Sequence, residues 1–164
     1  MAWDAIARQY DVDADSTKLT RPKDQKGGYQ LGTIEFAAKK GKSIDLDKIH
    51  ESITATRLSG GTRMRMDYLE ITAKGEVIER DKELVLKVSG TGQELVLSEE
   101  STAKDGLQRL REAVARGDKV STVTGRVPGW NGRFPVVLAA WAKAPETEKR
   151  KLAVVDFKVE KKER

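Results

Sequence analysis

The chain has 164 residues, with 31 lysine and arginine side chains against 26 aspartate and glutamate side chains, and its formal net charge is +5. It contains no cysteine and one histidine, which excludes disulfides and thiolate metal sites and leaves few side chains for nucleophilic catalysis. We therefore expect a binding protein that needs no cofactor, rather than an enzyme. Because the charges are mixed, the basic excess fits an ordinary solvated surface as well as a surface for polyanions.

No apolar run approaches the roughly 18–20 residues that a membrane-spanning helix needs, so no membrane span is expected. The first residues, MAWDAI, lack a basic segment followed by an apolar stretch, and no signal peptide is predicted. A processed exported protein would begin in the same way, so the compartment stays open. The sequence also leaves the oligomeric state open.

Residues 1–28 are predicted to form a short helix and a linker. Trp3, Ile6 and Tyr10 have the spacing of one helical face. Residues 11–28 follow, a polar segment that contains a proline and two adjacent glycines. We interpret this segment as a linker or an ordered loop, because such residues favour turns.

Residues 29–68 are predicted to form a β–α–β unit. It begins with an alternating strand, and residues 46–58 then have a helical apolar face that follows Asp45, a favoured N-cap residue. Residues 62–77 are the next predicted strand, but their apolar positions change face at Leu69. A strand alternates with period two, so the change indicates a bulge or a change of sheet. We place the domain junction there.

Residues 69–160 alternate as strands with one interruption. Three strand patterns end near residue 98, a helical pattern lies between Asp105 and Gly117, and strands are predicted at 119–127 and 152–159, with a further one at 136–141. Three strands, a helix and two or more strands is the order of an OB-type barrel. Residues 161–164 form a charged tail. The expected core comprises Ile71, Val77, Leu84, Leu86, Leu95, Leu97, Val123 and Val155, with Leu110 and Val114 of the helix over an open end.

The strand GTIEF, the helix LDKIHESITATRLS and the strand MDYLEITAKGEV lie between residues 32 and 77. Together they resemble one half of a heavy-metal-associated domain of the ferredoxin-like class. That family binds metal through an M-x-C-x-x-C motif between its first strand and its helix. The matching residues 36–43 hold three lysines and neither cysteine nor methionine. The resemblance therefore implies a ferredoxin-like half without the family's metal ligands.

The candidate metal ligands are His50, Met64 and Met66. The two methionines are two residues apart on a predicted strand, so they would share one face, and thioethers bind Cu(I). His50 would add an imidazole. The alternative is that the methionines fill a gap in the core and that His50 is a half-buried structural residue. Because no second histidine and no cysteine exists, we expect no metal site.

Arg63 and Arg65 share the other face of the same predicted strand, and Arg57 is near in sequence. Guanidinium groups gathered in this way suit an anion site. The alternative is that they form ion pairs with acidic neighbours such as Glu51 and Asp67.

The strongest candidate for a ligand-binding site is the predicted loop over residues 125–135. Arg126, Trp130, Arg133 and Phe134 alternate there on a glycine-rich segment. Nucleic-acid bases stack on aromatic rings and phosphates attract arginine, while an exposed tryptophan can anchor a protein partner. The alternative is a tight turn in which Trp130 folds back to close the barrel end, since tryptophan is usually largely buried.

These patterns together predict an α+β protein: an N-terminal helix and a β–α–β unit packed on a C-terminal OB-like five-stranded barrel with one helix. The leading hypothesis is a non-enzymatic binding or adaptor module that recognises a protein or another macromolecule. A second hypothesis is OB-type binding of single-stranded nucleic acid. A third is an accessory metal-related protein without a CxxC site.

Overall fold

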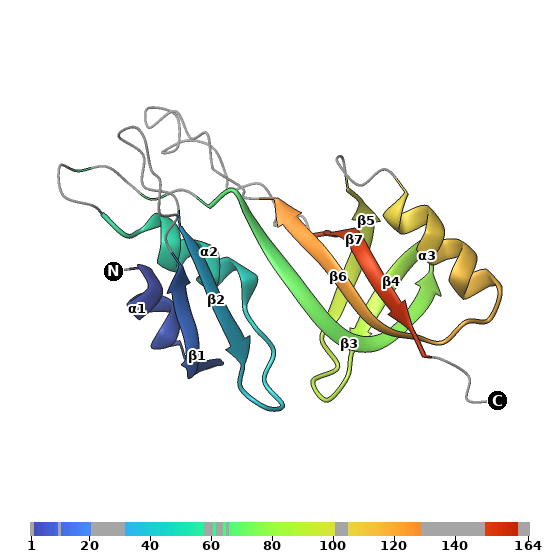
Figure 1. Ribbon diagram of the computed structural model, residues 1–164, viewed down its shortest axis with the longest axis horizontal. Coiled ribbons are helices and arrows are strands. Elements are labelled where there is room, and N and C mark those ends of the chain that lie inside the picture. Colours follow the sequence, from blue (N-terminus) through green and yellow to red (C-terminus); the bar gives the residue numbers. More distant parts are fainter. Residues whose placement is uncertain are drawn as a thin grey trace. The chain divides into compact units, whose positions relative to one another are not determined.

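The computed structural model describes residues 2–9, 11–20, 32–57, 61, 64, 66–100, 105–128 and 150–160. These residues form three helices, a two-stranded sheet and a closed five-stranded barrel, so the predicted α+β class is confirmed (Figure 1). The chain divides into two compact units, Met1–Met66 and Asp67–Arg164.

The first unit holds two helices and the two-stranded sheet. Its elements are α1 (Ala2–Ala7), β1 (Val12–Thr20), β2 (Thr33–Ala38) and α2 (Leu46–Thr54). The strands pair antiparallel, and helix α1 packs on β1 and on α2. Ile6 of α1, Val12 of β1 and Ile49 of α2 are fully buried. These three aliphatic side chains therefore join both helices to the sheet.

Two expectations for this unit are wrong. The predicted linker over residues 11–28 contains strand β1, and β2 pairs with β1 rather than with a strand that follows α2. The described residues therefore contain no β–α–β pairing, and the ferredoxin-like half is not confirmed. Strand β1 buries only one side chain fully, that of Val12. The strand therefore has no need of alternating apolar residues, and its sequence has none. The pairing of β1 with β2 shifts register between Asp13 and Lys18. Within this shift, the Ser16 hydroxyl accepts a hydrogen bond from the Ala37 amide at 2.8 Å.

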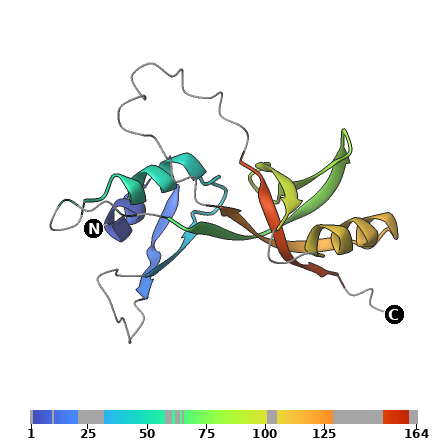
Figure 2. The same cartoon turned by 90° about the horizontal axis from the view of Figure 1, so that it is seen from above.

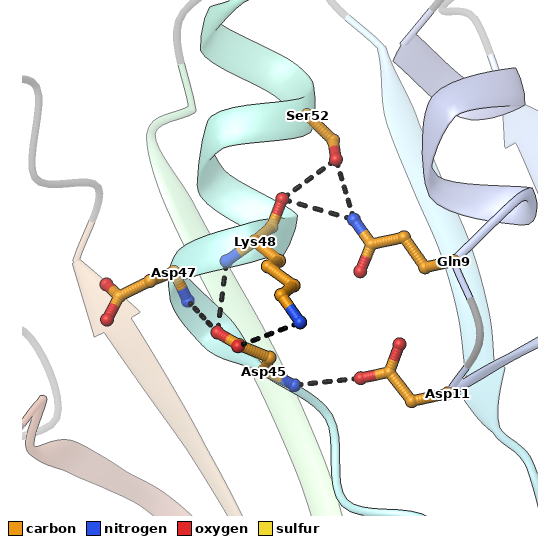
Figure 3. Close-up of polar contacts among 6 residues, drawn as sticks. All are labelled: Gln9, Asp11, Asp45, Asp47, Lys48 and Ser52. Atoms are coloured by element: carbon orange, nitrogen blue, oxygen red, sulfur yellow. Dashed lines mark hydrogen bonds and ion pairs between the residues drawn. The ribbon is translucent and has the colours of Figure 1, made fainter.

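Helix α2 begins where predicted, at a network of polar contacts (Figure 3). The N-cap residue Asp45 accepts hydrogen bonds from the amides of the second and third helical residues, both at 3.1 Å. Its own amide donates to Asp11 at 3.0 Å. Gln9 donates to the Lys48 carbonyl at 3.1 Å and to the Ser52 hydroxyl at 2.6 Å. The segment after α1 is thereby tied to the first turns of α2.

The helix ends at Thr54, earlier than the predicted end at residue 58. The hydroxyl of Thr54 donates to the His50 carbonyl at 2.9 Å, and that of Thr56 donates to the Ser52 carbonyl at 2.8 Å. Side-chain hydroxyls that bond to carbonyls one turn back compete with helix continuation.

We expect Asp45→Ala to lower the free energy of unfolding of the first unit by about 1 kcal/mol, the usual loss for an N-cap carboxylate. Urea unfolding followed by circular dichroism measures this change. Asp15→Ala is the control, because it removes the same charge from an exposed strand position. Equal losses for the two variants would contradict a capping role for Asp45.

The second unit is the barrel. Its elements are β3 (Tyr68–Arg80), β4 (Glu83–Val88), β5 (Glu94–Glu99), α3 (Gly106–Ala115), β6 (Val120–Pro128) and β7 (Leu152–Val159). The strand order is β3-β4-β5-β7-β6, with β5 and β7 parallel and the other pairs antiparallel. The predicted order of three strands, one helix and two further strands is confirmed. Residues 136–141 lie outside the described residues.

Strand β3 is long because it pairs with two neighbouring strands, and it is visibly curved (Figure 1). Residues 68–74 pair with β6, and residues 75–80 pair with β4. The strand begins at Tyr68, so Met64 and Met66 precede it. The change of face at Leu69 therefore marks the start of the strand rather than a bulge within it.

Helix α3 packs against β5 and β7 (Figure 2). It buries Leu110 and Ala113, whereas Val114 is only half-buried. On β7, Val154 is buried in place of the predicted Val155, because the pairing of β6 with β7 shifts register beside Gly125. Of the other expected core residues, Ile71 and Val77 are half-buried, and the buried ones are Leu84, Leu86, Leu95, Leu97 and Val123.

The two ends of α3 differ in how they are capped. Gly117 follows the helix with φ +77°, a conformation that favours glycine after a helix. At the other end the Asp105 side chain makes no capping hydrogen bond. The Gln108 side chain instead donates to Glu112 one turn later, at 3.0 Å.

Candidate functional site

Of the predicted ligand-binding residues, the structure describes Arg126. The others lie outside the described residues: Arg63, Arg65, Trp130, Arg133 and Phe134. Arg126 belongs to strand β6 and not to a loop over residues 125–135. Its neighbours Gly125 and Val127 are buried, so the alternation of the strand places Arg126 on the outer face of the barrel.

Arg126 joins two residues of β3 to form what we call the Tyr68–Arg126 cluster, made of Tyr68, Glu70 and Arg126. Glu70 lies directly opposite Arg126 in the antiparallel pairing. The Arg126 Nε donates to the Glu70 carboxylate at 2.9 Å. The Arg126 guanidinium carbon lies 4.5 Å from the centroid of the Tyr68 ring. The guanidinium is thus held over the ring by a hydrogen bond from a neighbouring position.

The cluster is open to solvent. Tyr68 is 51% exposed, the highest value among the large apolar and aromatic side chains that the structure describes. The side chains of Arg126 and Glu70 are 33% and 43% exposed. Cation–π contacts and exposed ion pairs contribute little to folding stability. The arrangement therefore exposes a large aromatic ring that the barrel does not need for its core.

The Glu70 carboxylate balances the charge of Arg126. The hydrogen bond to Glu70 raises the pKa of Arg126 above its ordinary value. The guanidinium stays protonated at every physiological pH. The cluster consequently presents hydrogen-bond donors without a strong positive field.

Next to the cluster, the same outer face continues with hydroxyl groups. Thr72 and Thr124 lie opposite each other, with their hydroxyl oxygens 2.9 Å apart. The terminal Nη1 and Nη2 groups of Arg126 donate no hydrogen bond to the described residues. This face therefore combines an aromatic ring, guanidinium donors that bond to no described residue, and neutral hydroxyls.

Sequence reasoning missed Tyr68 and Glu70 as functional candidates. Neither residue was among the predicted site residues. The signal that identifies them is the pairing of β3 with β6, which joins residues 56 positions apart in the chain. Such pairing is not encoded in local periodicity.

The metal candidates are not arranged as predicted. Met66 is buried, while Met64 and His50 are half-buried, and neither methionine belongs to a strand. The expectation that the methionines share one strand face is wrong. Among the described residues, no group of three or more histidine, aspartate or glutamate side chains could hold a metal ion. Arg57, the proposed neighbour of the other arginines, is exposed after α2.

Comparison of the chain with known protein families, curated proteins and solved structures found no match. None of the described helices combines the length and the apolar character that crossing a bilayer requires.

Proposed function

We propose that the chain is a non-enzymatic binding module whose OB-type barrel anchors a protein partner at the Tyr68–Arg126 cluster. The observation that carries this proposal is the half-exposed Tyr68 ring beneath a guanidinium held by Glu70. Tyrosine and arginine are enriched among the residues that dominate protein–protein binding energy. Because the rotamers of both side chains are restrained before binding, less conformational entropy is lost on association.

The barrel topology supports the OB-type assignment. Three antiparallel strands precede the helix, two strands follow it, and β5 closes the barrel by a parallel pairing with β7. Members of that fold bind ligands through strands 2 and 3 and through the loops after strands 1 and 4. The cluster lies near the end of β6, the fourth barrel strand. Trp130, Arg133 and Phe134, which the sequence predicts as ligand-binding residues, follow closely in the sequence.

The charges favour a protein partner over single-stranded nucleic acid. A phosphate that approached Arg126 would meet the carboxylate of Glu70. Arg80, at the end of the first barrel strand, is likewise occupied, with bonds of 2.9 and 3.0 Å to Glu94 of β5. Nucleic-acid binding depends on unpaired lysine and arginine that replace counterions along the backbone.

We expect Tyr68→Ala to weaken binding of the partner about 30-fold, or ~2 kcal/mol, the size of a typical interface hot spot. The partner is first isolated by cross-linking from the source cells, identified and purified. Isothermal titration then compares the wild type with Tyr68→Ala and with Val159→Ala, a second exposed apolar position on the barrel.

Val159→Ala should bind as the wild type does. Unchanged binding by Tyr68→Ala would contradict the proposed interface. Binding of a single-stranded oligonucleotide by the wild type at physiological salt, lost in Tyr68→Ala, would replace the protein-binding proposal with the nucleic-acid one.

A further inference from the structure

The outer face of β3 and β6 has most of the groups that bind single-stranded nucleic acid. Tyr68 offers a ring on which a base can stack, and Arg126 offers Nη1 and Nη2 donors that bond to no described residue. Thr72 and Thr124 add hydroxyls beside them. Base stacking on an aromatic ring and phosphate contacts from arginine are the two components of sequence-independent binding.

One residue opposes that use. Glu70 sits directly across the strand pair from Arg126, and its carboxylate accepts the Nε hydrogen bond at 2.9 Å. The carboxylate therefore lies within a few ångströms of any anion that the guanidinium could bind. At that separation, repulsion between two negative charges offsets much of the attraction to the single positive charge.

We propose that Glu70 is a specificity-determining residue, which keeps polyanions off the Tyr68–Arg126 cluster and reserves the cluster for uncharged hydrogen-bond acceptors such as the peptide carbonyls of a protein partner. The inference rests on the proposed function in one respect, that this cluster is a binding surface. Specific interfaces commonly contain a repulsive element against the wrong partner as well as attractive contacts to the right one.

Glu70 also positions Arg126, so its charge must be removed without losing the hydrogen bond. Glu70→Gln does this, because the amide oxygen of glutamine still accepts from Nε and the side chain keeps its length. The pair is exposed on both sides, and such ion pairs contribute little to stability, so the variant should fold as the wild type does.

The matched control is Glu76→Gln. Glu76 is exposed on the same strand, and its substitution changes the net charge by the same amount. It lies opposite Lys87 of β4, away from the pairing of β3 with β6. An increase in affinity for an anionic ligand that is due to net charge alone would appear in both variants. An increase that is due to the local electric field at Arg126 would appear in Glu70→Gln only.

The probe is a fluorescein-labelled oligothymidylate, titrated at low salt and followed by fluorescence anisotropy. We expect Glu70→Gln to bind it about tenfold more tightly than the wild type, with a plot of log K against log[salt] that is steeper by about 0.7, the value for one phosphate contact on a single strand. Glu76→Gln should match the wild type. Glu70→Gln combined with Arg126→Ala should lose the gain, because the gain depends on the released guanidinium.

Equal affinity of the wild type and Glu70→Gln would overturn the inference, as would an equal gain in Glu76→Gln. These results are separable from the test of the proposed function. If Tyr68→Ala does not weaken binding of the protein partner, the interface lies elsewhere, but the oligonucleotide result still stands. If Glu70→Gln does not bind the oligonucleotide more tightly, Glu70 does not exclude polyanions, but the effect of Tyr68→Ala on binding of the protein partner still stands.

Discussion

Leu110→Ala is expected to lower the free energy of unfolding of the barrel unit by about 3 kcal/mol, the middle of the range for a leucine truncated in a packed core. Leu110 is completely buried on the face of α3 that packs against β5 and β7. The loss has two parts, the transfer free energy of the removed methyl groups and the cavity they leave. Urea unfolding followed by circular dichroism measures the sum.

Leu107→Ala is the matched control for Leu110→Ala. It makes the same chemical change on the same helix, at a position that is only half-buried. Its loss should be at most about half as large, because the side chain is already partly hydrated and leaves little enclosed volume. Equal losses would contradict the rotational setting of α3, in which residues 106, 110 and 113 face the strands.

Gly125→Ala is expected to lower the free energy of unfolding by about 2–3 kcal/mol, the cost of overpacking a closed core. A Cβ atom built at Gly125 would lie 2.6 Å from Leu152 Cγ and 2.8 Å from the Ala153 carbonyl oxygen. Alanine would restrict the unfolded chain and so favour folding by about 0.5–1 kcal/mol. The steric cost is larger, because one of the two contacts is to strand backbone that cannot rotate away.

Gly32→Ala is the control for that substitution. Its nearest atoms would be at 3.5 and 3.6 Å, ordinary contact distances, so the change should be close to neutral. Thermal unfolding of both variants shows whether the steric cost or the restriction of the unfolded chain is larger. A Gly125→Ala protein as stable as the wild type would contradict the close approach of β6 and β7. Since Gly125 precedes Arg126, this variant should also weaken partner binding by displacing the guanidinium.

The barrel could be predicted from the sequence because its evidence is local. Leu84 and Leu86, and likewise Leu95 and Leu97, recur at the two-residue spacing of a strand and are buried, although Val85 between the first two is buried as well. Short turns join the first three strands, and turn residues are also recognised locally. The order of strands and helix then follows from reading along the chain.

The first unit was harder to predict for a physical reason. Strand β1 buries only Val12 fully, and a register shift between Asp13 and Lys18 interrupts its pairing with β2. A strand with so little buried surface has no apolar alternation to detect. Its pairing depends on backbone hydrogen bonds and on the Ser16 hydroxyl, which a polar loop could equally contain.

The residue types at the candidate site come from the sequence, and their arrangement comes from the tertiary structure. The sequence predicted Arg126 as a candidate, because arginine beside aromatic residues is a local signal. It could not identify Tyr68 and Glu70 as partners of Arg126, because both lie on β3, and Glu70 is 56 positions away from Arg126 in the chain. Closure of the barrel sets the register between those strands, and that register decides that Arg126 meets a carboxylate and a ring rather than open solvent.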